Sequence, residues 1–150
     1  MKKTDTTNNA ESISLLQKIE PMIQQNVIKT LKITFGEDIT QWWHNGVPAA
    51  IKKKAIEEAQ LQGEYKEFEK YLYFVDLKEI ITKNWELFKD IYAIDSKHDN
   101  KKKGLEWFTK MNDIRNICYH PPRGGVSNEL LEFLKLIYTE LEGIIGVIPQ

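Results

Sequence analysis

The sequence predicts an all-α protein, folded as a compact bundle of about five helices. Apolar residues recur at intervals of three and four in several stretches, and no stretch shows the sustained alternation of a half-buried strand. A chain of 150 residues with 41% hydrophobic content can bury one substantial core. We therefore expect a disordered polar tail over residues 1–11 and a single helical domain over residues 12–150.

The first helix is predicted between about Leu16 and Phe35, where apolar residues follow a helical period. Pro21 lies inside this helix and should kink it or divide it, because proline has no N–H to donate. Residues 36–38 should end the helix. The tryptophan pair that follows is then expected in an aromatic-rich loop, residues 42–48.

Three helices are expected in the middle of the chain, over about 48–60, 66–73 and 76–91. Pro48 suits the first position of a helix, where its missing N–H has no partner to lose. Asp76 and Glu79 have the spacing of an N-terminal capping pair. An interruption is expected near Asn84, and a polar connection over residues 93–104 leads to the penultimate helix.

The penultimate helix, expected over about residues 102–119, carries two stripes of side chains. One stripe is apolar and is predicted to face the core, and it consists of Trp107, Met111, Ile114 and Cys118. The other mixes apolar and polar side chains, and it consists of Leu105, Phe108, Asn112, Arg115 and Tyr119. This mixed stripe suits either contact with a second copy of the chain, in a homodimer, or burial of the helix on two sides within one chain.

The last helix is expected to begin after Ser127, a residue type that caps helix starts. Its apolar face belongs to the core and comprises Leu130, Leu134, Ile137, Leu141 and Ile144. A turn rich in proline and glycine, residues 121–125, precedes it. Because that connection is short, the last two helices are expected to be antiparallel.

The most unusual residues of the chain gather at the predicted end of the penultimate helix. Both arginines of the chain, Arg115 and Arg123, lie within five residues of His120. Pro121 disfavours helical backbone at His120, so the imidazole is expected to leave the helix and turn back toward Arg115 and Asn116. A cation that stays charged then lies beside a group that titrates near neutral pH.

Arg115 and Asn116, followed by His120 at the end of a helix, resemble the motif of HEPN domains (higher eukaryotes and prokaryotes nucleotide-binding). This helical family is rich in metal-independent endoribonucleases. From about Leu16 onward, most of the chain is similar to the HEPN subgroup attached to RNA-surveillance and defence proteins. The further residues of this resemblance are Trp42, Trp43, Gly46, Val47, Pro48, Tyr71, Asp76, Asn84, Trp85, Phe88, Trp107 and Asn112. The resemblance implies a HEPN-like bundle that acts as a homodimer, in a toxin or anti-phage defence setting.

The resemblance also implies cleavage of RNA by attack of a ribose 2′-hydroxyl on the adjacent phosphate. This transesterification needs a base, an acid and positive charge at the phosphorane. His120 is the candidate base or acid, Arg115 is the candidate phosphate ligand, and Asn116 orients the histidine or donates to the phosphate. One histidine cannot be base and acid in the same step, so a homodimer would supply the second. No metal and no other cofactor is expected.

Three further residues are candidates for RNA contact, namely Lys110, Tyr119 and Arg123. Seven cations and three acids lie between residues 97 and 123, a local balance of +4. Tyr119 suits the mixed stripe equally well, and Arg123 suits hydrogen bonds to loop carbonyls. The lysine runs at 52–54 and 101–103 fit solvated faces as well as RNA contact.

A non-catalytic role remains the alternative to cleavage. Arg115 can pair with Asp113 or Glu106, while His120 caps the negative end of the helix. The chain would then be a HEPN module used for dimerisation, or for docking RNA or a partner protein such as an antitoxin or a larger defence protein.

The composition of the chain excludes several classes of protein and site. A net charge of −1 argues against a protein that coats nucleic acid. The single cysteine, Cys118, excludes an internal disulfide and a cysteine-based zinc site. The sequence has no apolar run of membrane length and no secretion signal at its start, so a cytoplasmic location is expected. Of the other histidines, His44 suits a structural role or an aromatic platform, and His98 suits solvent.

Overall fold

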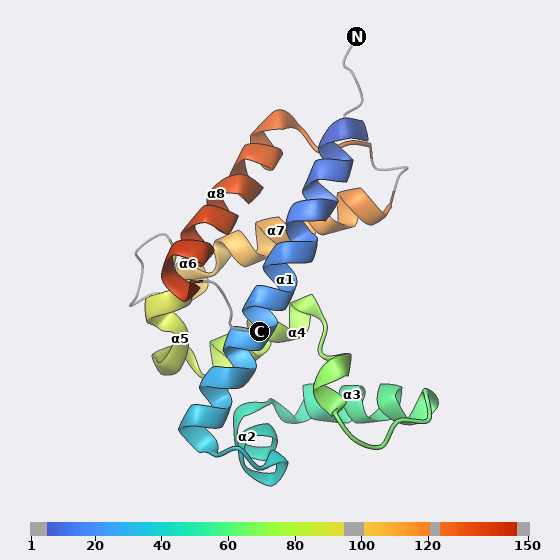
Figure 1. The fold of residues 1–150 in the computed structure, drawn as a ribbon, viewed down its shortest axis with the longest axis vertical. Helices are drawn as coiled ribbons and strands as arrows, with labels where there is room; N and C mark the ends of the chain where they lie inside the picture. The colour runs from blue at the N-terminus through green and yellow to red at the C-terminus, as the bar shows by residue number, and fades with distance from the viewer. Residues whose placement is uncertain (1–5, 95–100, 121–123, 147–150) are drawn as a thin grey trace. The chain divides into compact units, whose positions relative to one another are not determined.

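The computed structural model describes residues 6–94, 101–120 and 124–146. Across these ranges the chain is helical and contains no strand, which confirms the all-α prediction (Figure 1). The elements are α1 (Thr6–Phe35), α2 (Ile39–Gly46), α3 (Ala49–Leu61), the 3-10 turn η1 (Phe68–Tyr71), α4 (Phe74–Lys83), α5 (Trp85–Tyr92), α6 (Lys101–Gly104), α7 (Glu106–Tyr119) and α8 (Asn128–Ile145). The expected number of about five helices is not confirmed, because α2 is additional and two predicted helices are divided.

The described residues group into two compact units. The terminal unit contains the chain up to Ile23 and from Lys89 onward, and the middle unit contains Gln24–Phe88. The single domain expected over residues 12–150 therefore consists of two such units, whose boundaries fall inside α1 and α5. Pro21 does not divide α1, which continues through it as a helix.

In the middle unit, α1 ends where the sequence predicts, because Gly36 adopts a positive φ of +122°. The predicted aromatic loop is wrong, since Trp42 and Trp43 lie in α2 and both are buried. Asp38 caps this helix, because its side chain accepts a hydrogen bond from the backbone N–H of Thr40 at 2.8 Å. Eight residues are too few for apolar periodicity to reveal such a helix.

The start of α4 differs from the prediction that Asp76 and Glu79 form a capping pair. α4 begins earlier, at Phe74, and Asp76 accepts a hydrogen bond from the backbone N–H of Tyr73 at 2.8 Å. Asp76 also accepts from Lys54 Nζ at 2.6 Å, so its buried carboxylate is paired. The acid therefore lies inside the first turn and not in front of it.

Other boundaries in the middle unit agree with the sequence. α3 follows Pro48 and ends before Gly63, which has a positive φ of +74°. The short helix predicted over residues 66–73 is the 3-10 turn η1. Asn84 separates α4 from α5, and its Nδ2 donates to the carbonyl oxygen of Gly46 at 2.8 Å. The interruption predicted near Asn84 is confirmed.

In the terminal unit, α1 begins at Thr6, within the tail expected over residues 1–11, and residues 1–5 of that tail lie outside the described residues. Asn8 Nδ2 donates to the carbonyl oxygen of Val126 at 3.0 Å, and the N–H of Val126 donates to Asn9 Oδ1 at 2.7 Å. These bonds hold the first turns of α1 against the segment that precedes α8. Because the bonded residues lie 117 and 118 positions apart, no local pattern could reveal them.

The apolar stripe predicted for the penultimate helix is confirmed on α7. Its members Trp107, Met111, Ile114 and Cys118 are all buried. The mixed stripe is buried at its start, where Leu105 and Phe108 are 2% and 1% exposed, and Tyr119 at its end is exposed. Burial on two sides within one chain therefore accounts for Leu105 and Phe108, and these two residues are not available to a second copy.

α8 begins after Ser127, whose Oγ accepts a hydrogen bond from the backbone N–H of Leu130 at 3.2 Å, as predicted. The chain turns back after α7 into α8 (Figure 1). The buried residues of α8 include Leu134, Ile137 and Leu141, whereas Ile144 is exposed. Three of the five residues of the predicted apolar face of α8 are therefore buried.

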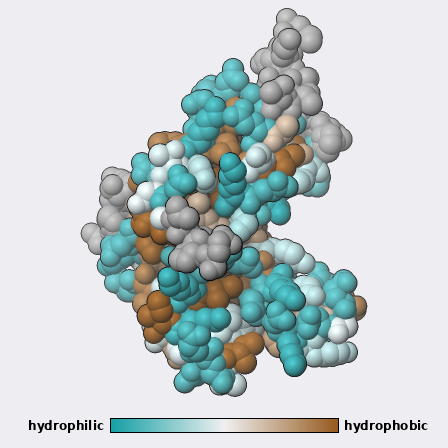
Figure 2. Space-filling view, viewed as in Figure 1, coloured by the Kyte–Doolittle hydropathy of each residue, from teal (hydrophilic) through white to brown (hydrophobic). Residues whose placement is uncertain are grey.

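None of the helices in the described part of the chain is long and apolar enough to cross a membrane. On the face shown in Figure 2, hydrophilic side chains cover most of the surface and hydrophobic ones form separate patches. Large exposed apolar side chains include Ile33, Leu61, Leu136 and Ile144. These residues come from α1, α3 and α8, so neither unit is free of exposed apolar surface.

Candidate functional site

His120 is the residue at which the chain leaves α7. It is the C-cap of the helix, with φ −132° and ψ 79°, and its side chain is exposed. This backbone conformation lies outside the helical region, which a following proline disfavours. The candidate residues Arg115, Asn116 and His120 therefore lie at the C-terminal end of α7, and the His120 side chain is exposed.

Arg115 lies in the last turns of α7, and its partner is Glu20 of α1. The Nε–H of Arg115 donates to Glu20 Oε2 at an Nε–Oε2 distance of 2.6 Å. The two side chains are 35% and 27% exposed, so the pair is partly shielded from solvent. The pairing of Arg115 with Asp113 or Glu106, considered as the structural alternative, is not the one that forms.

Sequence reasoning did not identify Glu20, because it lies 95 residues before Arg115. One signal was available. Glu20 stands four residues after Leu16 and three before Ile23, so it lies along the same side of α1 as two residues of the predicted core. An acid at such a position requires a partner when the helix packs, and the structure supplies Arg115.

Tyr119 is the second neighbour of Arg115. The guanidinium carbon of Arg115 lies 5.3 Å from the centroid of the Tyr119 ring, within the range of a cation–π contact. The two residues are four positions apart on α7, where side chains of one helix face meet. Tyr119 is 47% exposed, so part of its ring remains accessible.

The guanidinium of Arg115 retains the capacity to bind a further anion. Its bond to Glu20 uses Nε, and among the described residues no hydrogen bond from Nη1 or Nη2 is present. Two parallel N–H groups of this kind match the oxygens of a phosphate. Asn116 is half-buried next to this side chain in the sequence, and His120 is exposed at the end of the helix.

The remaining candidates for RNA contact do not converge on Arg115 in the same way. Lys110 extends over the ring of Phe133 on α8, with Nζ 4.3 Å from the ring centroid. Arg123 and His98 lie outside the described residues. Lys101, Lys102 and Lys103 are exposed on the short helix α6.

The lysine run at 52–54 and the nearby His44 have structural contacts in the middle unit. Lys52 Nζ donates to the backbone carbonyl of His44 at 3.0 Å, and Lys54 binds the buried Asp76. His44 itself is exposed at the end of α2. These contacts favour the structural role over RNA contact for Lys52 and Lys54.

Cys118 is not available as a nucleophile. Its thiol is buried, with Sγ 4.0 Å from the backbone carbonyl oxygen of Asn9, and burial raises its pKa. A raised pKa lowers the fraction of reactive thiolate at any given pH. Within the ranges that the structure describes, no three histidine, cysteine or acidic side chains are grouped so that they could hold a metal ion.

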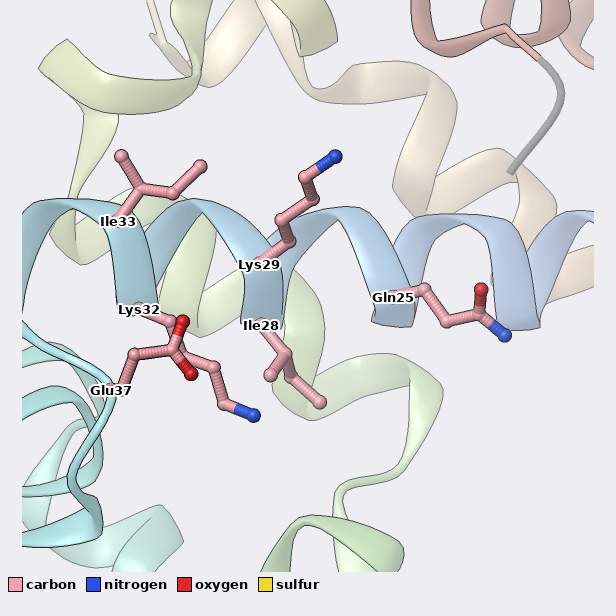
Figure 3. Close-up of a pocket in the computed structure, with 6 residues that line it drawn as sticks. All are labelled: Gln25, Ile28, Lys29, Lys32, Ile33 and Glu37. Atoms are coloured by element: carbon pink, nitrogen blue, oxygen red, sulfur yellow. The ribbon is translucent and has the colours of Figure 1, made fainter. Parts of the chain in front are cut away.

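A separate groove lies along the second half of α1, in the middle unit. Its volume is about 400 Å³, and its lining residues are Gln25, Ile28, Lys29, Lys32, Ile33 and Glu37. Figure 3 shows Lys29 and Lys32 extending from opposite sides of the helix, so the two ammonium groups do not converge on one anion. No lining residue carries an imidazole or a thiol. The candidate chemistry therefore stays with the end of α7.

Comparisons of the chain with protein-family models, with curated proteins and with solved structures found no match. The residues at the end of α7 and their geometry are therefore the basis for a function.

Proposed function

We propose that the protein is a HEPN-like, metal-independent endoribonuclease that acts as a homodimer on cellular RNA in the cytoplasm. The observation that carries the proposal is the placement of the motif. Arg115 and Tyr119 contact each other near the end of α7, where His120 is also exposed, while another stripe of the same helix is buried. Polar and aromatic residues grouped at an exposed helix end favour binding or catalysis over packing.

In the proposed reaction, the ribose 2′-oxygen attacks the adjacent phosphorus and the bond from phosphorus to the 5′-oxygen breaks. The products are a 2′,3′-cyclic phosphate and a free 5′-hydroxyl, so the step consumes neither water nor an oxidant. His120 accepts the proton of the 2′-hydroxyl, and a second His120 protonates the leaving oxygen. Arg115 binds the non-bridging oxygens, where negative charge accumulates in the transition state. Asn116 orients the histidine or donates to the same oxygens.

We propose a homodimer because the reaction needs two histidines, one as base and one as acid. Each chain supplies one, His120 at the end of α7. Because Leu105 and Phe108 are buried within the chain, the proposed contact uses the exposed end of α7 around Tyr119. A shared axis at that end would bring the two motifs into one cleft. A toxin or anti-phage defence system, with an antitoxin or a larger defence protein as a further partner, is the setting that the HEPN resemblance suggests.

The ion pair between Arg115 and Glu20 favours a second candidate function. A guanidinium that already has an acidic partner is partly neutralised, as expected for a residue that fixes α7 against α1. The chain would then be a non-catalytic HEPN module that docks a partner protein or RNA. This candidate predicts binding without cleavage.

The two candidates are separated by variants of the motif assayed on RNA. The purified parent is expected to cleave RNA, and Arg115→Ala and His120→Ala are each expected to lower the rate by about a hundredfold or more. His44→Ala is the matched control, because it removes another exposed histidine, from the middle unit. Cleavage that persists in His120→Ala would falsify the nuclease assignment. Binding of RNA without cleavage by the parent would support the docking module.

A further inference from the structure

Glu20 makes a short, charged contact with the arginine that we assign to the phosphate. Its Oε2 lies 2.6 Å from Arg115 Nε, and this short distance identifies a charge-assisted hydrogen bond. The bond joins two helices of the terminal unit, α1 and α7. It therefore determines where the end of the arginine side chain lies.

We infer that Glu20 is a positioning residue, which holds Arg115 through Nε so that its two terminal amino groups present a fixed fork to one phosphate of single-stranded RNA. The inference rests on the proposed function and adds a residue to the same site. A guanidinium is planar, and its Nη1 and Nη2 edge is the one that remains when Nε is occupied. Tyr119, with its ring 5.3 Å away, restrains the same group from its face.

Both ends of this contact are attached to well-packed helices. Glu20 is flanked on α1 by Ile19 and Ile23, which are fully buried, and Arg115 follows the fully buried Ile114 on α7. An ion pair between two mobile surface side chains contributes little, because ordering them costs entropy. Here the backbone at both residues is fixed by the core, which is the condition for a preorganised binding group.

The negative charge of Glu20 also has an effect on RNA binding that opposes the positioning of Arg115. A carboxylate next to Arg115 lowers the positive potential that RNA encounters. If neutralisation were its main effect, removal of Glu20 would strengthen binding and raise the rate. If positioning is its main effect, removal of Glu20 lowers the rate although binding stays equal or improves. The two effects are therefore distinguished by the sign of the change in kcat.

Two substitutions of Glu20 separate orientation from charge. Glu20→Ala removes the acceptor, and we expect kcat to fall about tenfold to a hundredfold with KM unchanged or lower. Glu20→Gln removes the charge but keeps an oxygen that accepts from Arg115 Nε, so most of kcat should return. The matched control is Glu11→Ala, which removes an acid of α1 that pairs with Lys135 at 3.5 Å and does not touch Arg115.

Three kinetic results would contradict the inference. Faster cleavage by both Glu20→Ala and Glu20→Gln would show that Glu20 restrains the enzyme by neutralising Arg115, and it would overturn the inference. Equal losses of kcat in the two variants would also overturn it. The charge of Glu20, and not its orientation of Arg115, would then determine the rate. A loss in Glu20→Ala no larger than that in Glu11→Ala would reduce the contact to a structural one.

A spectroscopic signature tests the contact without relying on cleavage. The chain has only two arginines, so a ¹⁵N–¹H spectrum of the arginine Nε–H groups should contain two signals, which Arg123→Lys assigns. We expect the Nε–H signal of Arg115 to exchange slowly in the parent and to exchange rapidly in Glu20→Ala.

A single-stranded oligonucleotide that lacks the attacking 2′-hydroxyl should leave this Nε–H signal in place, because Glu20 remains bound while Nη1 and Nη2 contact the phosphate. Displacement of the Nε–H bond by the oligonucleotide, in a protein that does cleave RNA, would overturn the inference alone. No response of either arginine to the oligonucleotide and no cleavage of RNA would instead reject the proposed function, and the inference with it.

Discussion

Tyr119 is the exposed aromatic side chain of α7, and at the scale of single residues it shows what kind of RNA the site can accept. Its ring contacts the guanidinium of Arg115 and remains 47% exposed. An accessible aromatic ring beside an arginine suits an unstacked base whose phosphate the arginine binds. Bases in a duplex are already stacked on one another. The arrangement therefore favours single-stranded over double-stranded RNA.

Replacement of Tyr119 tests this preference. Tyr119→Ala should weaken the binding of a single-stranded oligonucleotide by about 1–3 kcal/mol, because one stacking surface is lost. Tyr119→Phe keeps the ring and should retain most of the affinity. Fluorescence anisotropy with labelled oligonucleotides measures both. Equal affinity of the parent for single-stranded and duplex RNA would contradict this role.

The motif residues also show which part of the site could be predicted from the sequence. The position of His120 followed from its neighbour Pro121, since a proline restricts the residue before it. The position of Glu20 on the apolar side of the first helix indicates an acid that needs a partner, but the identity of that partner depends on tertiary packing and leaves no local pattern. The sequence suggests Glu106 or Asp113, two neighbours on the same helix, as the partner of Arg115, whereas the structure places the partner on α1.

At the scale of helices, α7 is buried on two sides near its start and is accessible near its end. Trp107 Nε1 donates to the backbone carbonyl of Tyr92 at 2.8 Å, and Phe108 packs beside the Trp107 ring at a centroid distance of 4.7 Å. The periodicity of a helix reveals which residues share a face. It cannot tell whether a mixed face meets the rest of the chain or a second copy, because both kinds of partner require the same spacing.

Phe108→Glu tests the burial of this second face. A carboxylate in place of a side chain that is 1% exposed should destabilise the fold by several kcal/mol, since a charge would lose its hydration without gaining a partner. The midpoint of urea unfolding, followed by circular dichroism, measures the loss. Leu136→Glu, on the exposed surface of α8, is the control and should leave the midpoint nearly unchanged. A stable, folded Phe108→Glu monomer would show that Phe108 belongs to a dimer contact after all.

The short elements of the middle unit explain the other differences from the sequence. α2 owes its start to the Asp38 cap and has only eight residues, so its two tryptophans gave no helical period. The sequence predicts Asp76 in front of its helix, whereas it lies in the first turn of α4. An acid can cap a helix from outside or stabilise its first turn from inside, so its spacing alone does not distinguish the two positions. Caps depend on one or two hydrogen bonds, and their exact place is decided by packing.

At the scale of the whole molecule, the helical class was predictable and the division into two units was not. Apolar spacing shows that a segment has a buried face, whereas it does not show which faces pack together. The boundaries at Ile23 and Phe88 fall inside helices, where the composition of the chain does not change. No linker rich in glycine or proline marks either boundary in the sequence.

Mixing of active and inactive chains tests the proposed homodimer. If each cleavage needs two copies of His120, dimers of one parent chain with one His120→Ala chain should be inactive. In an equimolar mixture, activity per parent chain should then fall to about half after the subunits have exchanged. Mixing with His44→Ala chains is the control and should leave the activity per parent chain unchanged. Activity that stays constant in both mixtures, or a monomer in sedimentation at micromolar concentration, would contradict the dimer.

The most direct test of the central claim is the chemistry of the RNA ends that the parent protein produces in the presence of EDTA. Transesterification through Arg115 and His120 predicts that cleavage continues with the chelator and leaves 2′,3′-cyclic phosphates and 5′-hydroxyls. The two ends can be distinguished by mass spectrometry of a cleaved oligonucleotide. Loss of cleavage in EDTA, or products that carry a 5′-phosphate, would contradict the account.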